Sequence, residues 1–446
     1  MSTPVLQDPM TPFAGALQGA LASRHPGEPA AVGALRTAAG RRFSALDLPT
    51  PRQEAWRFTN LRTLAELSPH PAIRGGIDVD PAAVDRWRVA ETCEMVFVNG
   101  HFHQELSRLA DLPEGVVVGS LAELLAVRPE LVTPHLARHA AFEQHAPAAL
   151  NTALFTDGAA VVIPRNAVVD RPVHLLFLAG AGEHPVAVFP RVLLVAGEHA
   201  QVTVVETHAG LGGEVVSFPV TEVVVGDGAV VDHYTLQRES LDTFHIATQA
   251  VYQGRASHFS THWISVGGRL VRKDLHAHLA GEGSEAMLNS LYLAGGTQHV
   301  DAHLVVEHAK PHCESHELFK GILDGRASAV FDGLIHVYPG AQKTNAKQTN
   351  RNLLLSRGAL ANSNPQLRIF ADDVKCTHGS TTGHLDDEAV FYLRSRGIGE
   401  AAARGILTYA FAADLLAGIK VAAVREDLES LLFDRLPEGD VVRQAV

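Results

Sequence analysis

Cys376 and His378 are the pair of side chains in this sequence whose types and spacing best suit a shared metal ion. They lie two residues apart, so an extended chain points both side chains the same way. A thiolate with an imidazole favours iron or zinc, and Lys375 beside them favours the thiolate modestly. Zinc and iron–sulfur sites usually take about four ligands, so the other ligands must come from elsewhere in the chain or from a second protein. The alternative is a small buried cysteine beside a hydrogen-bonded histidine.

A second candidate for metal binding consists of His276, His278 and Glu282, which have the H-x-H-x3-E spacing of cupin iron and manganese sites. Two histidines two apart in a strand share one face, which suits chelation. A cupin site also needs a later histidine on a neighbouring strand after a Pro-Gly turn, and the sequence offers no clear candidate for it. The alternative is a set of polar strand residues on an outward face. A metal-dependent, cupin-like β-fold enzyme is therefore our second hypothesis for the function.

A third string, from His308 to His316, is dense in potential ligands. Pro311 breaks any helix, so His308 and His312 do not share a helical face. Cys313 and His316 could share a turn. The alternative is an exposed polar stretch near the end of a β-rich region.

The common signatures of nucleotide and hydrolase chemistry are missing from the sequence. It contains no GxxxxGK[ST] P-loop, no G-x-S-x-G nucleophile elbow and no GxGxxG string. Lys and Arg number 37 against 49 Asp and Glu, a formal charge of −12, which argues against nucleic-acid binding. We therefore expect neither an ATP site in this chain nor a nucleic-acid partner.

The expected location is the cytoplasm, without membrane contact. Three scattered cysteines are too few for a disulfide framework. The start of the chain, with Pro4, Asp8, Pro9 and Pro12, lacks the basic and apolar regions of a signal peptide. The most apolar stretch, 405–424, is interrupted by Asp414 and Lys420 and is better suited to a helix outside the membrane.

Three regions of different texture must position the candidate residues. Residues 1–150 are mostly helical in pattern, with a short strand expected at 94–98. Residues 151–383 consist of short β-type runs separated by glycine turns, which favours a β-solenoid. A two-sheet sandwich is the competing interpretation. Residues 384–446 predict three helices, of which the first ends at Gly397, the second spans about 400–416 and the third about 421–433.

Four strings resemble the SufB/SufD family of iron–sulfur cluster assembly scaffolds, and they are most similar to its SufD branch. The strings are PTPRQEAWRFT (49–59), TNAKQTNRNLLLS (344–356), DDVKCTHG (372–379) and FYLRSRGI (391–398). Their order and spacing cover the chain from about residue 50 to residue 398. One departure is the run 380–383, where the family more often has an alanine.

The resemblance implies a mainly β protein, a right-handed parallel β-helix between an N-terminal helical region and a C-terminal helical domain. It implies a non-catalytic scaffold that pairs with a SufB-like paralogue, docks a SufC-like ABC-type ATPase and forms no stable cofactor site alone. It places Cys376 and His378 at the paralogue interface, where iron or a nascent cluster would be held, with His378 the stronger candidate. The docking region for the ATPase would comprise Phe391, Tyr392, Leu393, Arg394, Ser395, Arg396, Gly397 and Ile398. Exposed strand edges also make a homodimer plausible for the isolated chain.

Overall fold

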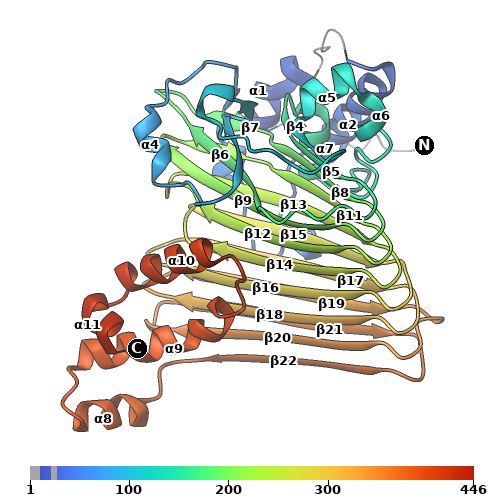
Figure 1. Cartoon of the computed structure of the whole chain (residues 1–446). Coiled ribbons are helices and arrows are strands. Elements are labelled where there is room, and N and C mark those ends of the chain that lie inside the picture. The colour runs from blue at the N-terminus through green and yellow to red at the C-terminus, as the bar shows by residue number, and fades with distance from the viewer. Residues whose placement is uncertain (1–10, 22–27, 446) are drawn as a thin grey trace, which may run out of the picture.

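A computed structural model describes residues 11–21 and 28–445 (Figure 1). Pro4, Asp8 and Pro9, which entered the expectation on signal peptides, lie outside the described residues. In Figure 1 the strands are stacked as rungs, with N-terminal helices at one end, β22 at the opposite end and the C-terminal helices along one side.

Two sheets of mainly parallel strands form the body of the protein. One sheet contains β1 (His70–Pro71), β4 (Val117–Ser120), β5 (Gly158–Ile163), β7 (Val186–Val188), β8 (Arg191–Ala196), β10 (Val215–Ser217), β11 (Val220–Val225), β13 (Phe244–Gln253), β15 (Leu270–Leu279), β17 (His299–His308), β19 (Ser328–Val337) and β21 (Leu360–Ile369). The other contains β2 (Cys93–Val98), β3 (His101–Phe102), β6 (Val173–Gly180), β9 (Gln201–Gly212), β12 (Val230–Arg238), β14 (His258–Ser265), β16 (Glu285–Ala294), β18 (Glu314–Leu323), β20 (Asn345–Leu354) and β22 (Lys375–Gly383).

Successive long strands alternate between the sheets, so each pair of strands makes one rung of a solenoid. The first sheet runs in the order β21-β19-β17-β15-β13-β11-β8-β5-β4, and the second in the order β22-β20-β18-β16-β14-β12-β9-β6-β2-β3. Within the described residues, the strand pairs β2–β3 and β4–β5 are antiparallel, and a single antiparallel bridge joins Glu94 of β2 to Arg108. Parallel pairing between strands one rung apart excludes the sandwich, whose sheets are antiparallel. The predicted β-solenoid is therefore confirmed.

Apolar side chains stack in register between the two sheets and form the core. One column follows the pairings from β5 to β19 and contains Val161, Leu194, Val223, Val251, Ala277, Val306 and Ile335, all of them buried. The turns stack as well. Gly296 and Gly325 have φ of +59° and +67°, and a Cβ on Gly325 would lie 3.1 Å from the backbone nitrogen of Gly296. Glycine therefore suits both the backbone conformation and the close spacing of these turns.

Helices cover the first end of the solenoid. They are α1 (Pro12–Leu21), α2 (Ala30–Leu46), η1 (Glu54–Trp56), α3 (Arg62–Ala65), α4 (Pro81–Asp85), η2 (Gln104–Leu106), α5 (Leu121–Val127), α6 (Pro129–Val132) and α7 (Ala146–Leu154). Phe13, Phe43 and Trp56 share a buried cluster with Phe218 and Phe244 of the body. Trp56 thus packs the N-terminal segment on the solenoid, and the predicted strand at 94–98 is confirmed by β2.

In the described residues, four helices follow β22, and the second and third of them pack on the outer face of its sheet. They are α8 (Asp387–Ser395), α9 (Glu400–Leu416), α10 (Ala422–Arg435) and α11 (Gly439–Ala445). The first three confirm the predicted helices, and α11 was not predicted. Leucines of α9 and α10 form a buried cluster with Tyr234, Ile264 and Leu291 of the sheet, so α9 and α10 are fixed to the body.

Candidate functional site

Cys376 and His378 lie on the final strand of the solenoid. In β22 they pair with Ala346 and Gln348 of β20, both of which are buried. Alternation along a strand therefore directs Cys376 and His378 toward the space between the sheets, on one face, as their spacing predicted. Within the described residues, no strand pairs with the other edge of β22. The two side chains thus occupy the open end of the solenoid interior.

His378 is held by the opposite final strand. Its Nδ1 lies 3.1 Å from the carbonyl oxygen of Pro365 on β21, and the side chain is exposed. A carbonyl only accepts, so the neutral ring carries its proton on Nδ1 and its lone pair on Nε2. Ser380 makes a second link, since its hydroxyl donates to Ser363 Oγ at 2.8 Å. His378 is therefore oriented with a free ligand atom at an accessible position.

Cys376 is half-buried beside His378. It packs against an apolar cluster that contains Ile335, Val337 and Ala346. Burial raises the pKa of its thiol, so the free chain holds a protonated cysteine at neutral pH. A bound cation would lower this pKa because thiolate is the form that binds metals.

Two buried polar side chains lie below His378 in the same inward column. Register joins His378 to Gln348, and Gln348 to Glu317 on β18. Glu317 and Gln348 are 2% and 0% exposed, and their side-chain oxygens and the Gln348 nitrogen have no hydrogen-bond partner among the described residues. Burial raises the pKa of Glu317 to about 8. The solenoid therefore keeps unsatisfied polar groups directly beneath its open end, which is uncommon in a folded core.

The rim of the open end combines free strand edges with exposed apolar side chains. Leu360, Ile369 and Phe370 are 55%, 39% and 58% exposed at the two ends of β21. Free strand edges together with exposed apolar side chains are typical of a surface that another chain covers.

The string 391–398 lies on α8 and the turn after it. Asp386 caps the helix by accepting from the Glu388 backbone nitrogen, and Gly397 follows its end with φ of +88°. Phe391 and Tyr392 are 72% and 57% exposed. Two exposed aromatic side chains side by side suit a protein interface better than solvent.

Glu282, from the second predicted metal string, does not complete a site. His276 and His278 do share the outward face of β15, but both lie beside Glu307 of β17. Glu282 lies in the turn after β15. In the third string, the alternative of an exposed polar stretch is wrong for His308 and Cys313, both fully buried.

A buried group that was missed from sequence is His208, Glu239 and His245, whose potential ligand atoms lie within 4.8 Å of one another. These residues come from β9, the turn after β12 and β13. The available indication was a glutamate and a histidine, Glu206 and His208, two residues apart in a valine-rich run.

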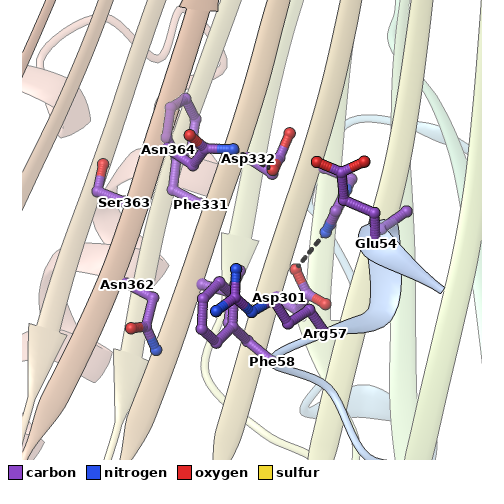
Figure 2. A pocket seen from close by; sticks show the side chains of 12 residues that line it. Glu54, Arg57, Phe58, Asp301, Phe331, Asp332, Asn362, Ser363 and Asn364 are labelled. Carbon is purple, nitrogen blue, oxygen red and sulfur yellow. Dashed lines mark hydrogen bonds and ion pairs between the residues drawn. The ribbon is translucent and has the colours of Figure 1, made fainter. Parts of the chain in front are cut away.

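Residues 49–59, the first of the four strings given above, are held against the sheet beside a cavity of about 350 Å³ (Figure 2). Arg272 donates to the Ala55 carbonyl and to Asp301, at 2.8 and 2.7 Å, and its guanidinium lies 3.7 Å from the Trp56 ring centre. In Figure 2, Glu54, Arg57 and Phe58 face strand residues that include Asp301 and Asp332. The cavity therefore marks where the N-terminal segment meets the last rungs.

Comparison with known proteins agrees with this architecture. The SUF system FeS cluster assembly SufBD core domain matches residues 177–411, and the SufBD protein N-terminal region matches residues 22–175. The chain belongs to the SufBD family of iron–sulfur cluster assembly proteins.

Similar proteins include two named SufD. An iron–sulfur cluster assembly SufBD family protein of Synechocystis is 37% identical over 90% of this chain and 90% of its own length. The iron–sulfur cluster assembly protein SufD of Escherichia coli is 30% identical over 88% of this chain and 90% of its own length. SufD of Bacillus subtilis is 27% identical over 87% and 90%. Within the described residues, none of the helices is long and apolar enough to cross a membrane.

Proposed function

We propose that this chain is a scaffold subunit that helps to assemble iron–sulfur clusters at an interface with a SufB-like paralogue. The observation that carries the proposal is the position of Cys376 and His378, side by side on the inward face of a strand with a free edge. Iron or a nascent cluster is the cargo of this site, not a resident cofactor of the chain.

The ligand set supports assembly between two chains. Cys376 and His378 supply one sulfur and one nitrogen, and iron–sulfur clusters usually take about four protein ligands. Of the polar side chains beneath them, Glu317 is neutral near pH 7 because burial raises its pKa to about 8. A partner strand on the edge of β22 would bring its own side chains to the same opening. The missing ligands are therefore assigned to the paralogue.

ATP hydrolysis belongs to a second partner in this proposal, a SufC-like ABC-type ATPase. The docking surface is α8 with its exposed Phe391 and Tyr392, continued by Gly397 and Ile398. Because α9 and α10 pack on the outer face of the solenoid, movement of the docked ATPase would be transmitted to the rungs below. The chain itself turns over no substrate and acts in the cytoplasm.

The test is co-expression with the SufB-like and SufC-like partners, followed by purification and measurement of cluster absorbance per complex. His378→Ala and Cys376→Ala should lower the cluster content while the complex still forms. His384→Ala is the matched control, because His384 is an exposed histidine whose Nδ1 also lies 2.8 Å from a carbonyl, that of Leu354. Equal cluster content in His378→Ala and His384→Ala would refute the proposed role.

A further inference from the structure

His276 and His278 converge on one carboxylate oxygen of the neighbouring strand. His276 Nε2 lies 2.8 Å, and His278 Nδ1 3.0 Å, from Oε2 of Glu307. The register explains this arrangement, because His278 is directly opposite Glu307 and His276 is opposite Val305. The acid that completes the group is therefore 29 residues from His278 in the sequence.

This group is open to solvent. The side chains of His276, His278 and Glu307 are 46%, 33% and 19% exposed. They lie on the outward face of the sheet, away from Cys376 and His378 in the interior. An ion in solution can reach them without any opening of the core.

Neighbouring side chains hold the acid and one of the rings. The Tyr338 hydroxyl donates to Glu307 Oε1 at 2.8 Å, and the Tyr338 ring stacks on His336 with ring centres 4.5 Å apart. Tyr252 stacks on His278 at 5.9 Å. Hydrogen bonds from the two histidines hold the pKa of Glu307 well below its usual range, so Oε2 is ionised. Such supporting contacts are typical of metal ligands, whose orientation they fix.

We propose that His276, His278 and Glu307 bind a divalent first-row transition-metal ion. Two imidazole nitrogens and one carboxylate oxygen are the donors that such ions accept readily, and the exposed side of the group leaves room for water ligands. The ion would take the place of the N–H hydrogens that now lie between the two rings and Oε2. A neutral ring would move its proton to its other nitrogen, which leaves the nitrogen that faces Oε2 free to bind the ion.

The buried group His208, Glu239 and His245 is a weaker candidate, although its ligand atoms are already closer together. Its side chains are 2%, 4% and 1% exposed. His208 Nε2 lies 2.7 Å from Glu206, a buried carboxylate outside the group, so this nitrogen is already engaged elsewhere. An ion would have to displace buried hydrogen bonds to enter.

The proposal is tested by titrating the full chain with Co²⁺, followed by visible spectroscopy and calorimetry. Cys376→Ser and His378→Ala are introduced into the parent protein, so that binding at the open end does not contribute. We expect one saturable equivalent of Co²⁺, and His276→Ala or His278→Ala should weaken it at least about tenfold. Tyr338→Phe removes the hydrogen bond to Glu307 Oε1 but keeps all three ligands. It should lower the Co²⁺ affinity by about tenfold.

The matched control is His258→Ala. His258 Nδ1 lies 2.9 Å from Glu285 Oε2 and its side chain is 50% exposed, but no second histidine of the described residues is paired with Glu285. Co²⁺ affinity should be unchanged in this variant. The chain has 25 histidines, so a control of the same type is needed to detect weak background binding. Absence of a saturable equivalent in the parent, or equal affinity in His276→Ala, His278→Ala and His258→Ala, would overturn the proposal.

Discussion

His378 and Pro365 join the last strands of the two sheets, since His378 Nδ1 on β22 lies 3.1 Å from the Pro365 carbonyl on β21. Proline has no backbone N–H to donate to a further strand, which suits a final strand. The contact fixes the tautomer of His378 and leaves Nε2 free at the open end of the solenoid. The open end of the solenoid thus limits continuation of one sheet and presents a ligand atom from the other.

Stability should depend on pH through Glu317. Its pKa is about 8 in the folded chain against 4.5 ordinarily. Between these values the folded chain binds a proton that the unfolded chain has lost, so the free energy of unfolding should fall with rising pH, by about 1.4 kcal/mol per unit. In Glu317→Gln this contribution is absent. Urea unfolding from about pH 5 to about pH 8 should show the variant gaining stability relative to wild type, whereas a constant difference would contradict the assignment.

Replacing Phe391 and Tyr392 should prevent ATPase docking without destabilising the chain. Both side chains are mostly exposed, so alanine substitutions at such sites change the free energy of unfolding by less than about 0.5 kcal/mol. Exposed aromatic anchors often contribute 2 kcal/mol or more to binding, about thirtyfold in affinity. Calorimetric titration with the SufC-like partner measures the loss. Val441→Ala, at another exposed apolar residue of the C-terminal helices (50% exposed), is the control and should bind normally.

Trp56 should be a major stabilising residue of the N-terminal segment. It is 5% exposed, and the Arg272 guanidinium lies 3.7 Å from its ring centre. Trp56→Ala should cost about 3–5 kcal/mol, as large-to-small changes in a core do. Phe58→Ala, two residues away and 49% exposed, should cost about 0.5 kcal/mol or less. Chemical denaturation compares the two variants, and similar losses would show that the segment is not clamped through Trp56.

Charge on the apolar rim of the open end should interfere with the paralogue but not with the ATPase. Phe370→Lys and Ile369→Lys place charge on the apolar rim, where these side chains are 58% and 39% exposed. We expect loss of the SufB-like partner, and of any homodimer, in size-exclusion chromatography, with retained binding of the SufC-like partner. Unchanged pairing with the paralogue would place the interface elsewhere.

The sequence predicted which segments form helices and strands better than it predicted which strands pair with each other. Helices at 400–416 and the strand at 94–98 follow from local pattern, and both were confirmed. Strands that pair lie about one rung apart in the sequence, and their pairing leaves no pattern within either strand. Alternation of polar and apolar residues alone therefore could not exclude a sandwich. For the same reason Glu282 was chosen over Glu307 as the companion of His276 and His278, although only Glu307 lies beside them. The buried Glu317 and Gln348 were missed because a polar residue in an alternating strand is ordinarily assigned to the solvent face.

The most direct test asks whether His378 binds the cluster. This chain is labelled with the heavy nitrogen isotope in histidine only, combined with unlabelled partners, and the reduced cluster is studied by pulsed electron paramagnetic resonance. We expect a strong coupling to one labelled nitrogen, which disappears in His378→Ala and persists in His384→Ala. A cluster without any labelled-nitrogen coupling, or with one that survives in His378→Ala, would contradict the central claim.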